Sequence, residues 1–305
     1  MKGYFFALAS AVLLGLMAVL VKIVLDMGLS LLGTIFLRFS LSALFLAVLL
    51  WKRRGILRIE KRQLALLFVV AVVGYGVMNL CYYGAFLRIS VGLTSMIHYI
   101  YPIVAVLLSR TLFRNTFSKG VYGALLLGVA GAMVLSLSDI GSIDPPGVLL
   151  ALGAGVCYGF YAALMEHPLL KNLPGTVVVF YLSLFTAAFA LGLGPVFGEL
   201  PFNALNPKAF GLMVVIALLC TVLALFLFRE AVVSIGTVRT TILSTLEPVT
   251  SAVLGILLLG EGIDGSMVVG SVMILLAVIG ITLRREAAGN GGAPLPEEES
   301  ELRKG

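Results

Sequence analysis

Long apolar stretches alternate with short polar ones along nearly the whole chain. Each apolar stretch is close to the roughly 20 residues that an α-helix needs to cross the hydrocarbon core of a bilayer. The pattern predicts ten membrane-spanning helices, over residues 3–25, 30–51, 63–87, 91–109, 118–137, 147–166, 175–197, 208–229, 237–259 and 265–283. We therefore expect an all-α integral membrane protein with short connections between its helices.

The composition supports this fold class. Of the 305 residues, 60% are hydrophobic and 12% are charged, and the mean hydropathy is +1.12. Soluble globular domains carry about 25% charged residues, so a water-soluble fold is disfavoured. The polar tail over residues 286–305 has too little apolar surface to fold alone and is predicted to be a disordered cytoplasmic end. The cysteines lie in apolar stretches without paired metal-ligand spacing, so no disulfide, metal or cofactor is expected.

The charged residues indicate the orientation of the chain. Connection 52–62 holds six Lys or Arg residues and one acid, Glu60, and further basic residues fall on the same side. The alternate connections are mostly acidic, with Arg88 and Lys208 as exceptions. Because basic connections stay on the cytoplasmic side, both termini are predicted to be cytoplasmic, in the cytoplasmic (inner) membrane. The net charge of +6 is thus a topology signal, and no nucleic-acid partner is expected.

The chain also resembles itself. Placing Pro102 on Pro248 aligns residues 85–102 with 231–248, with matches at Ala85 and Ala231, Ile89 and Ile235, and Thr94 and Thr240. Each matching segment begins where the third and fourth helices of a five-helix set join. Since five is odd, two fused copies lie in opposite orientations, as in many secondary transporters. The sequence predicts two inverted five-helix repeats, at residues 1–140 and 141–285.

These features resemble the drug/metabolite transporter superfamily, specifically its ten-helix EamA type. The resemblance covers about residues 3–284 and is carried by Ala231 seventeen residues before Pro248, by Glu247-Pro248-Val249 and by Leu259-Gly260-Glu261. The first repeat departs from the pattern at Tyr101-Pro102 and Phe113-Arg114-Asn115, and Lys22 and Arg38 stand where such proteins often carry a basic residue. The resemblance implies alternating-access transport of a small metabolite, often export, through a central cavity.

Ionisable groups in the bilayer core are costly, so each is a functional candidate. Glu247 lies near the middle of its predicted helix, where it is a candidate for proton coupling, for pairing with a substrate amine or for pairing with Arg38. His98 is a second coupling candidate because histidine titrates near neutral pH. Arg38 is expected to hold a substrate carboxylate or to pair with Glu247. A purely structural role remains the alternative for each of the three.

Polar and aromatic side chains complete the candidate site. Polar or aromatic residues that are three or four positions apart lie on the same face of a helix, and three such stripes occur. A cage of tyrosines suits amino-acid-like, aromatic or cationic solutes. One stripe runs through Tyr75, Asn79 and Tyr82. The predicted substrate-binding residues are Arg38, Asn79, Tyr82, His98, Tyr99, Tyr101, Tyr158, Tyr161, Thr240, Ser244 and Glu247.

The favoured function is secondary active transport of a small metabolite by alternating access. An uncoupled facilitator or channel is the first alternative. A membrane-embedded enzyme is the weaker one, because the aspartates lie in or beside connections and no motif marks a nucleophile. Direction, proton coupling, the substrate itself and the oligomeric state stay open.

Overall fold

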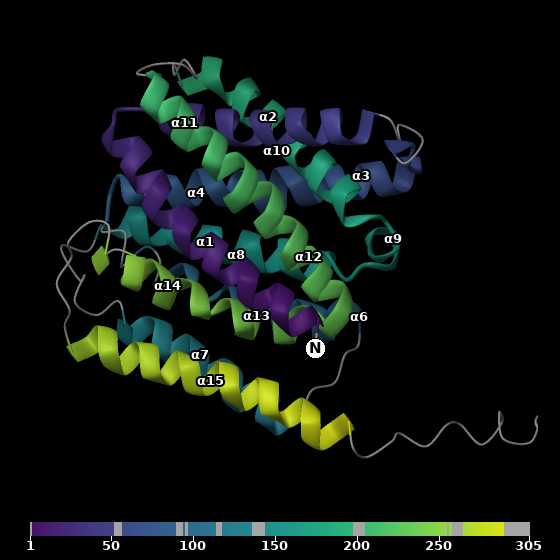
Figure 1. Cartoon of the computed structure of the whole chain (residues 1–305), viewed down its shortest axis with the longest axis vertical. Coiled ribbons are helices and arrows are strands. Elements are labelled where there is room, and N and C mark those ends of the chain that lie inside the picture. Colours follow the sequence, from purple (N-terminus) through teal and green to yellow (C-terminus); the bar gives the residue numbers. More distant parts are fainter. Residues whose placement is uncertain are drawn as a thin grey trace, which may run out of the picture.

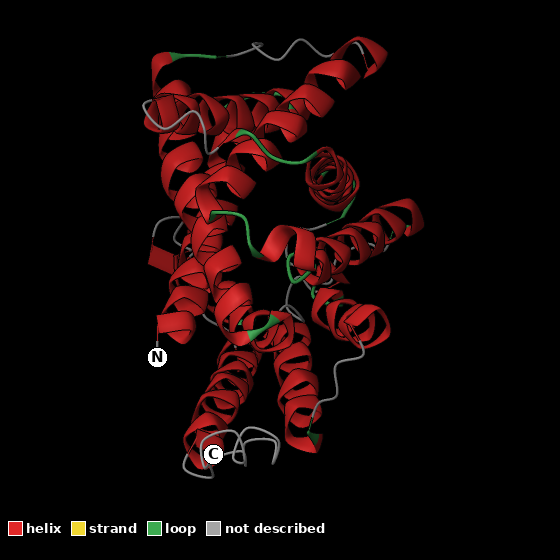
Figure 2. Cartoon of the chain, turned by 90° about the vertical axis from the view of Figure 1, so that its right-hand side faces the viewer, coloured by secondary structure: helices red, strands yellow, loops and turns green. Residues whose placement is uncertain are grey.

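The computed structural model describes residues 2–51, 57–89, 94, 97–113, 118–135, 144–197, 205–254, 256–257 and 265–289. All regular secondary structure in these ranges is helical (Figures 1 and 2). The elements of the first half are α1 (Lys2–Asp26), α2 (Leu31–Leu50), α3 (Lys61–Val69), the π-helical segment η2 (Val70–Gly76), α4 (Val77–Phe86), α6 (Tyr101–Phe113) and α7 (Lys119–Leu135).

The elements of the second half follow the same plan. They are α8 (Pro145–Leu164), the short α9 (Pro168–Lys171), α10 (Gly175–Phe197), α11 (Pro207–Val215), the π-helical segment η4 (Ile216–Leu223), α12 (Ala224–Ile235), α13 (Thr237–Ser244), α14 (Leu246–Leu254) and α15 (Gly265–Gly289). Every apolar stretch predicted from the sequence contains helix, which confirms the all-α class.

Six helical stretches in the described ranges are long and apolar enough to cross a membrane: Lys2–Asp26, Leu31–Leu50, Lys61–Phe86, Pro145–Leu164, Gly175–Val196 and Pro207–Ile235. Tyr101–Phe113, Lys119–Val134 and Val268–Gly280 are shorter apolar helices. The count of ten crossings and the inverted orientation of the halves stay predictions.

The predicted tail begins too early. Helix α15 continues to Gly289, so residues 286–289 are helical, and residues 290–305 lie outside the described residues. The extension has a local cause, because Glu286, Ala287 and Ala288 are strong helix formers and Gly289 is a weak one.

Helix ends follow local chemistry. The Ser30 hydroxyl accepts a hydrogen bond from the Gly33 amide at 3.1 Å at the start of α2, and the Asn206 side chain accepts one from the Ala209 amide at 2.9 Å at the start of α11. Such N-caps satisfy amides that have no partner within the helix. Pro248 lies in the first turn of α14, where a missing amide is tolerated, and the preceding helix α13 ends at Ser244.

The helices pack in pairs that join the two halves. Helix α2 packs against α10 and α7 against α15, while α1 packs against α12 and α14, and α8 packs against α4 and α6. In Figure 1, α7 and α15 form one edge of the bundle and α2 and α10 lie toward the opposite edge. Each of these partnerships between a helix of one half and a helix of the other has a counterpart with the halves exchanged.

Two π-helical segments occupy equivalent positions in the halves. The shift of 146 residues that places Pro102 on Pro248 also places Val70, the start of η2, on Ile216, the start of η4. A π-helical turn leaves backbone groups poorly paired inside its helix. The Ser42 hydroxyl of α2 donates to the Ala217 carbonyl of η4 at 3.0 Å, and the Thr186 hydroxyl of α10 donates to the Ala71 carbonyl of η2 at 3.3 Å. Ala71 and Ala217 are themselves 146 residues apart. Each half therefore donates a hydroxyl hydrogen bond to the equivalent position in the π segment of the other half.

Candidate functional site

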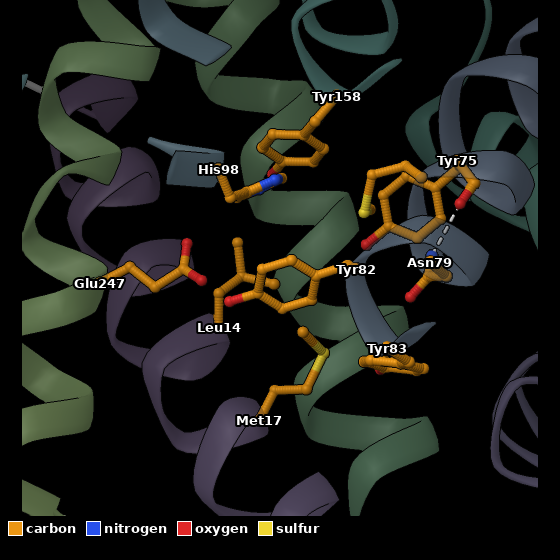
Figure 3. A pocket seen from close by; sticks show the side chains of 10 residues that line it. Leu14, Met17, Tyr75, Asn79, Tyr82, Tyr83, His98, Tyr158 and Glu247 are labelled. Atoms are coloured by element: carbon orange, nitrogen blue, oxygen red, sulfur yellow. Dashed lines mark hydrogen bonds between the residues drawn. The ribbon is translucent and has the colours of Figure 1, made fainter. Parts of the chain in front are cut away.

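A pocket lies between α1, η2, α4, α8 and α14 (Figure 3). The space between its lining atoms, with the opening to the outside included, is about 370 Å³. The lining residues are Leu14, Met17, Tyr75, Met78, Asn79, Tyr82, Tyr83, His98, Tyr158 and Glu247. The lining mixes apolar, aromatic and hydrogen-bonding side chains.

Glu247 supplies the carboxylate of the pocket. It lies in the first turn of α14 and approaches the pocket from the side opposite Tyr75 and Asn79, with Tyr82 between them (Figure 3). The ion pair with Arg38 that the sequence left open is absent. Among the described residues, the ion pairs are Arg88 with Asp144 and Arg229 with Glu230.

Arg38 is fully buried behind the pocket wall rather than in it. Its guanidinium donates to Thr221 at 2.6 Å, to the Tyr83 hydroxyl at 3.1 Å, and to the Asn79 carbonyl and the Tyr75 hydroxyl at 3.3 Å each. It also lies 4.7 Å from the centre of the Phe39 ring. Thr221 belongs to η4 and Tyr75 to η2, so Arg38 joins the π segments of both halves, and its partners are all neutral.

A layer of rings surrounds His98. The centre of its ring lies 4.7 Å from that of Tyr82, 5.4 Å from Tyr101 and 5.5 Å from Tyr158. Within the described part of the chain, the Nδ1 atom of His98 and the hydroxyls of Tyr99 and Tyr101 are buried without a hydrogen-bond partner. Buried polar groups nearly always find a partner, so these three atoms stand out in the layer of rings.

Tyrosine rings continue from this layer away from the pocket. Tyr158 and Tyr161 stack at 5.5 Å, and Tyr161 stacks on Phe228 at 5.8 Å. Tyr161 is 1% exposed and does not line the pocket. Its ring packs helix α8 against α12.

The predicted residues therefore fall into three groups. Five of them line the pocket, namely Asn79, Tyr82, His98, Tyr158 and Glu247. Four lie in the surrounding shell, namely Arg38, Tyr99, Tyr101 and Tyr161. Thr240 and Ser244 instead donate to backbone carbonyls one turn back in α13, at 2.8 and 3.0 Å.

Five lining residues were not among the predicted substrate-binding residues, namely Leu14, Met17, Tyr75, Met78 and Tyr83, although the sequence placed Tyr75 on one stripe with Asn79 and Tyr82. Tyr83 lies four residues after Asn79 and eight after Tyr75, so helical spacing alone would have included it. Leu14 and Met17 of α1 and Met78 of α4 carry no polar signal in the sequence, and only the packing of the helices reveals them.

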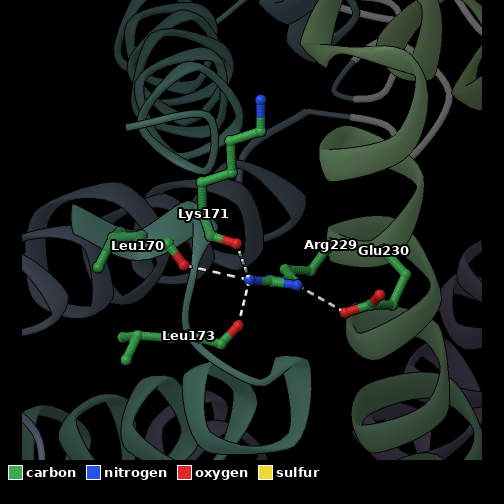
Figure 4. A network of polar contacts seen from close by, with 5 residues as sticks. All are labelled: Leu170, Lys171, Leu173, Arg229 and Glu230. Carbon is green, nitrogen blue, oxygen red and sulfur yellow. Dashed lines mark hydrogen bonds and ion pairs between the residues drawn. The ribbon is translucent and has the colours of Figure 1, made fainter. Parts of the chain in front are cut away.

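A second buried arginine lies away from the pocket. Arg229 of α12 donates to the carbonyl oxygens of Leu170, Lys171 and Leu173 and pairs with Glu230 at 2.6 Å (Figure 4). These carbonyls belong to α9 and the segment that leads from it into α10. Carbonyls at a helix end have no partner within the helix, so Arg229 fastens this connection to α12.

Both halves of the chain match known proteins in sequence. The model of the EamA-like transporter family matches residues 1–137 and 145–283. An uncharacterized transporter of Bacillus subtilis, YwfM, is 30% identical over 186 residues, which cover 59% of this chain and 60% of the relative. The threonine/homoserine exporter RhtA of Salmonella typhimurium is 29% identical over 257 residues, 83% of each chain.

A solved crystal structure has the same fold, with a TM-score of 0.77 and 19% identity over 93% of this chain and 98% of that one. The two family matches together cover most of the chain, and the relatives are transporters rather than enzymes. The resemblance noted in the sequence is thereby confirmed: this chain belongs to the EamA-like transporter family and is a membrane transporter.

Proposed function

We propose that this protein is a secondary active transporter that moves a small amino-acid-like solute across the cytoplasmic membrane by alternating access. The observation that carries the proposal is the charge arrangement of the pocket. A carboxylate, Glu247, lies on one side, and hydrogen-bonding side chains backed by the Arg38 guanidinium lie on the other. The relatives named as threonine/homoserine exporters agree with this class of solute.

In this proposal, Glu247 binds the ammonium group of the solute. The layer of rings around His98 offers faces that attract cations or stack on aromatic side chains. Aromatic amino acids and quaternary amines are therefore included in the candidate range. Glu247 and His98 are the candidate groups for proton coupling, and transport in either direction is compatible with the pocket.

The two halves pack against each other through equivalent pairs of helices, and this arrangement supports alternating access. Rocking of two inverted halves requires elements that can bend at equivalent places, and η2 and η4 are equivalent under the 146-residue shift. π-helical turns are common at functional sites.

On the predicted topology with cytoplasmic termini, the Glu166 carboxylate lies near the cytoplasmic side. There it accepts a bond from the Thr237 amide of α13 at 2.6 Å and one from Ser109 of α6 at 3.4 Å.

The test is transport by the purified protein in liposomes. Labelled L-threonine, L-phenylalanine and choline are each offered with and without a pH gradient. We expect one of the amino acids to be transported, and Glu247→Gln to lower the rate about tenfold or more because the solute amine loses a charge-assisted hydrogen bond. Asp144→Asn is the control, since its carboxylate pairs with Arg88 in a partly exposed ion pair away from the pocket.

The outcomes separate the alternatives. Wild-type rate and pH dependence in Glu247→Gln would remove both the amine-binding and the coupling role of this residue. Transport that no gradient drives uphill would favour the uncoupled facilitator. Failure to move any of the three solutes would contradict the proposed solute class.

A further inference from the structure

A buried positive charge without a carboxylate partner lies directly behind one wall of the pocket. Arg38 is 0% exposed, and its hydrogen-bond partners Thr221, Asn79, Tyr83 and Tyr75 are neutral. The ion pairs in the described part of the chain involve other residues. An unbalanced charge in the bilayer core costs several kcal/mol, so an anion that comes near it is strongly favoured.

The guanidinium fixes how its partners can bond. Arginine has donors and no acceptors, so the hydroxyl oxygens of Tyr75 and Tyr83 accept from it, at 3.3 and 3.1 Å. Each hydroxyl therefore keeps its own proton to donate. Within the described residues, neither proton has an acceptor, and both tyrosines line the pocket (Figure 3).

Asn79 lies between the two tyrosines, and both the oxygen and the nitrogen of its side-chain amide form hydrogen bonds. Its carbonyl oxygen accepts from Arg38 at 3.3 Å and its amide nitrogen donates to the Tyr75 backbone carbonyl at 2.8 Å. This pair of bonds defines the orientation of the amide and holds the wall in one arrangement. The wall thus presents two O–H donors that are polarised by the same cation.

We propose that the hydroxyls of Tyr75 and Tyr83 form a carboxylate-binding subsite, with Arg38 as the positioning residue that orients them and supplies the favourable charge. The proposal rests on the proposed function, because it assigns the acidic end of the solute whose amine binds Glu247. It also replaces direct binding of a substrate carboxylate by Arg38, one of the two alternatives that the sequence left open, since Arg38 does not line the pocket.

The test compares two probes that differ only at the acid group. L-threonine carries a carboxylate, and L-threoninamide carries a neutral carboxamide in its place. Binding of each to the purified full chain in detergent is measured by calorimetry for wild type, Tyr75→Phe and Tyr83→Phe. Each variant removes one hydrogen bond to a charged group, so threonine affinity should fall about tenfold or more, while threoninamide affinity changes by less than about threefold.

Two further variants complete the design. Tyr181→Phe is the matched control, because its hydroxyl donates to the Leu57 carbonyl outside the pocket, and both affinities should stay at the wild-type value. Arg38→Lys keeps the charge but loses the planar fork that reaches several acceptors, so the preference for threonine over threoninamide should shrink. The tyrosine variants keep the test valid even if the arginine variant fails to fold.

Two results would overturn the subsite: equal losses for both probes in Tyr75→Phe and Tyr83→Phe, or a wild type that binds threoninamide as tightly as threonine. In either case an amine is still bound, and the proposed function stands. If the wild type neither binds threonine nor moves any of the three liposome solutes, the proposed function itself fails, and the subsite fails with it.

Discussion

The two buried arginines differ in what surrounds them. Arg38 and Arg229 are 0% and 4% exposed. Arg229 donates to three backbone carbonyls and pairs with a carboxylate, Glu230. Arg38 bonds only to neutral side chains, most of which line the pocket. Burial alone therefore does not identify function: the neutralised charge of Arg229 fastens two segments of the fold, whereas the unbalanced charge of Arg38 lies behind the pocket wall.

Removing Arg229 should have the largest effect on stability. Arg229→Met leaves three carbonyls without their donor and Glu230 without its partner, which we expect to lower the free energy of unfolding by about 3–5 kcal/mol. The measurement is denaturation by SDS in mixed micelles. Arg88→Met is the control, because its partly exposed ion pair with Asp144 should contribute less than about 1 kcal/mol. Equal losses in the two variants would contradict the structural role of Arg229.

Removing Arg38 should give the opposite pattern. Arg38→Met eliminates a buried charge that has no counter-charge, and Tyr75 and Tyr83 can turn toward the pocket. The free energy of unfolding should therefore change by less than about 2 kcal/mol. Transport of L-threonine in liposomes should fall about tenfold or more, because the carboxylate loses its favourable charge. If Arg38→Met unfolds as easily as Arg229→Met, the two arginines do not differ in role.

The sequence could predict the depth of Arg38 but not its surroundings. Its position eight residues into an apolar stretch marked it as costly, which was correct. Its partners Tyr83 and Thr221 are 45 and 183 residues away, and no helical period relates such positions. Pairing with Glu247, one of the two alternatives that the sequence left open, does not occur in the structure, because Glu247 lies across the pocket, on α14.

The spacing of polar residues also predicted more pocket residues than line the pocket in the structure. Thr240 and Ser244 share a helix face with Glu247, and the spacing placed all three in the site. In an apolar helix, however, a hydroxyl can bond to the carbonyl one turn back, and both do so. The tyrosine stripe of the third helix was more informative, because phenol groups are too long to bond to their own backbone and must find partners across the bundle.

The π-helical segments had no signal that sequence reasoning could use. Residues 70–76 and 216–223 have the same apolar composition as the α-helix around them. In the structure, each segment accepts a hydrogen bond from a hydroxyl of the other half, from Thr186 for η2 and from Ser42 for η4. The 146-residue shift that was read from one proline match thus also relates these two contacts, while the repeat itself stays a prediction.

The smallest expected effect comes from removing the two hydroxyls that bond to the π segments, those of Ser42 and Thr186. The Ser42 hydroxyl also lies 2.7 Å from the Arg38 carbonyl, whereas the Thr186 hydroxyl donates to the Ala71 carbonyl. Ser42→Ala and Thr186→Val should each lower the free energy of unfolding by about 1 kcal/mol, the usual contribution of one hydrogen bond. Calorimetry should show weaker L-threonine binding in Ser42→Ala alone, because only that change loosens the turn of α2 that carries Arg38. Equal weakening in both variants would mean that the pocket depends on the π segments in general and not on the position of Arg38.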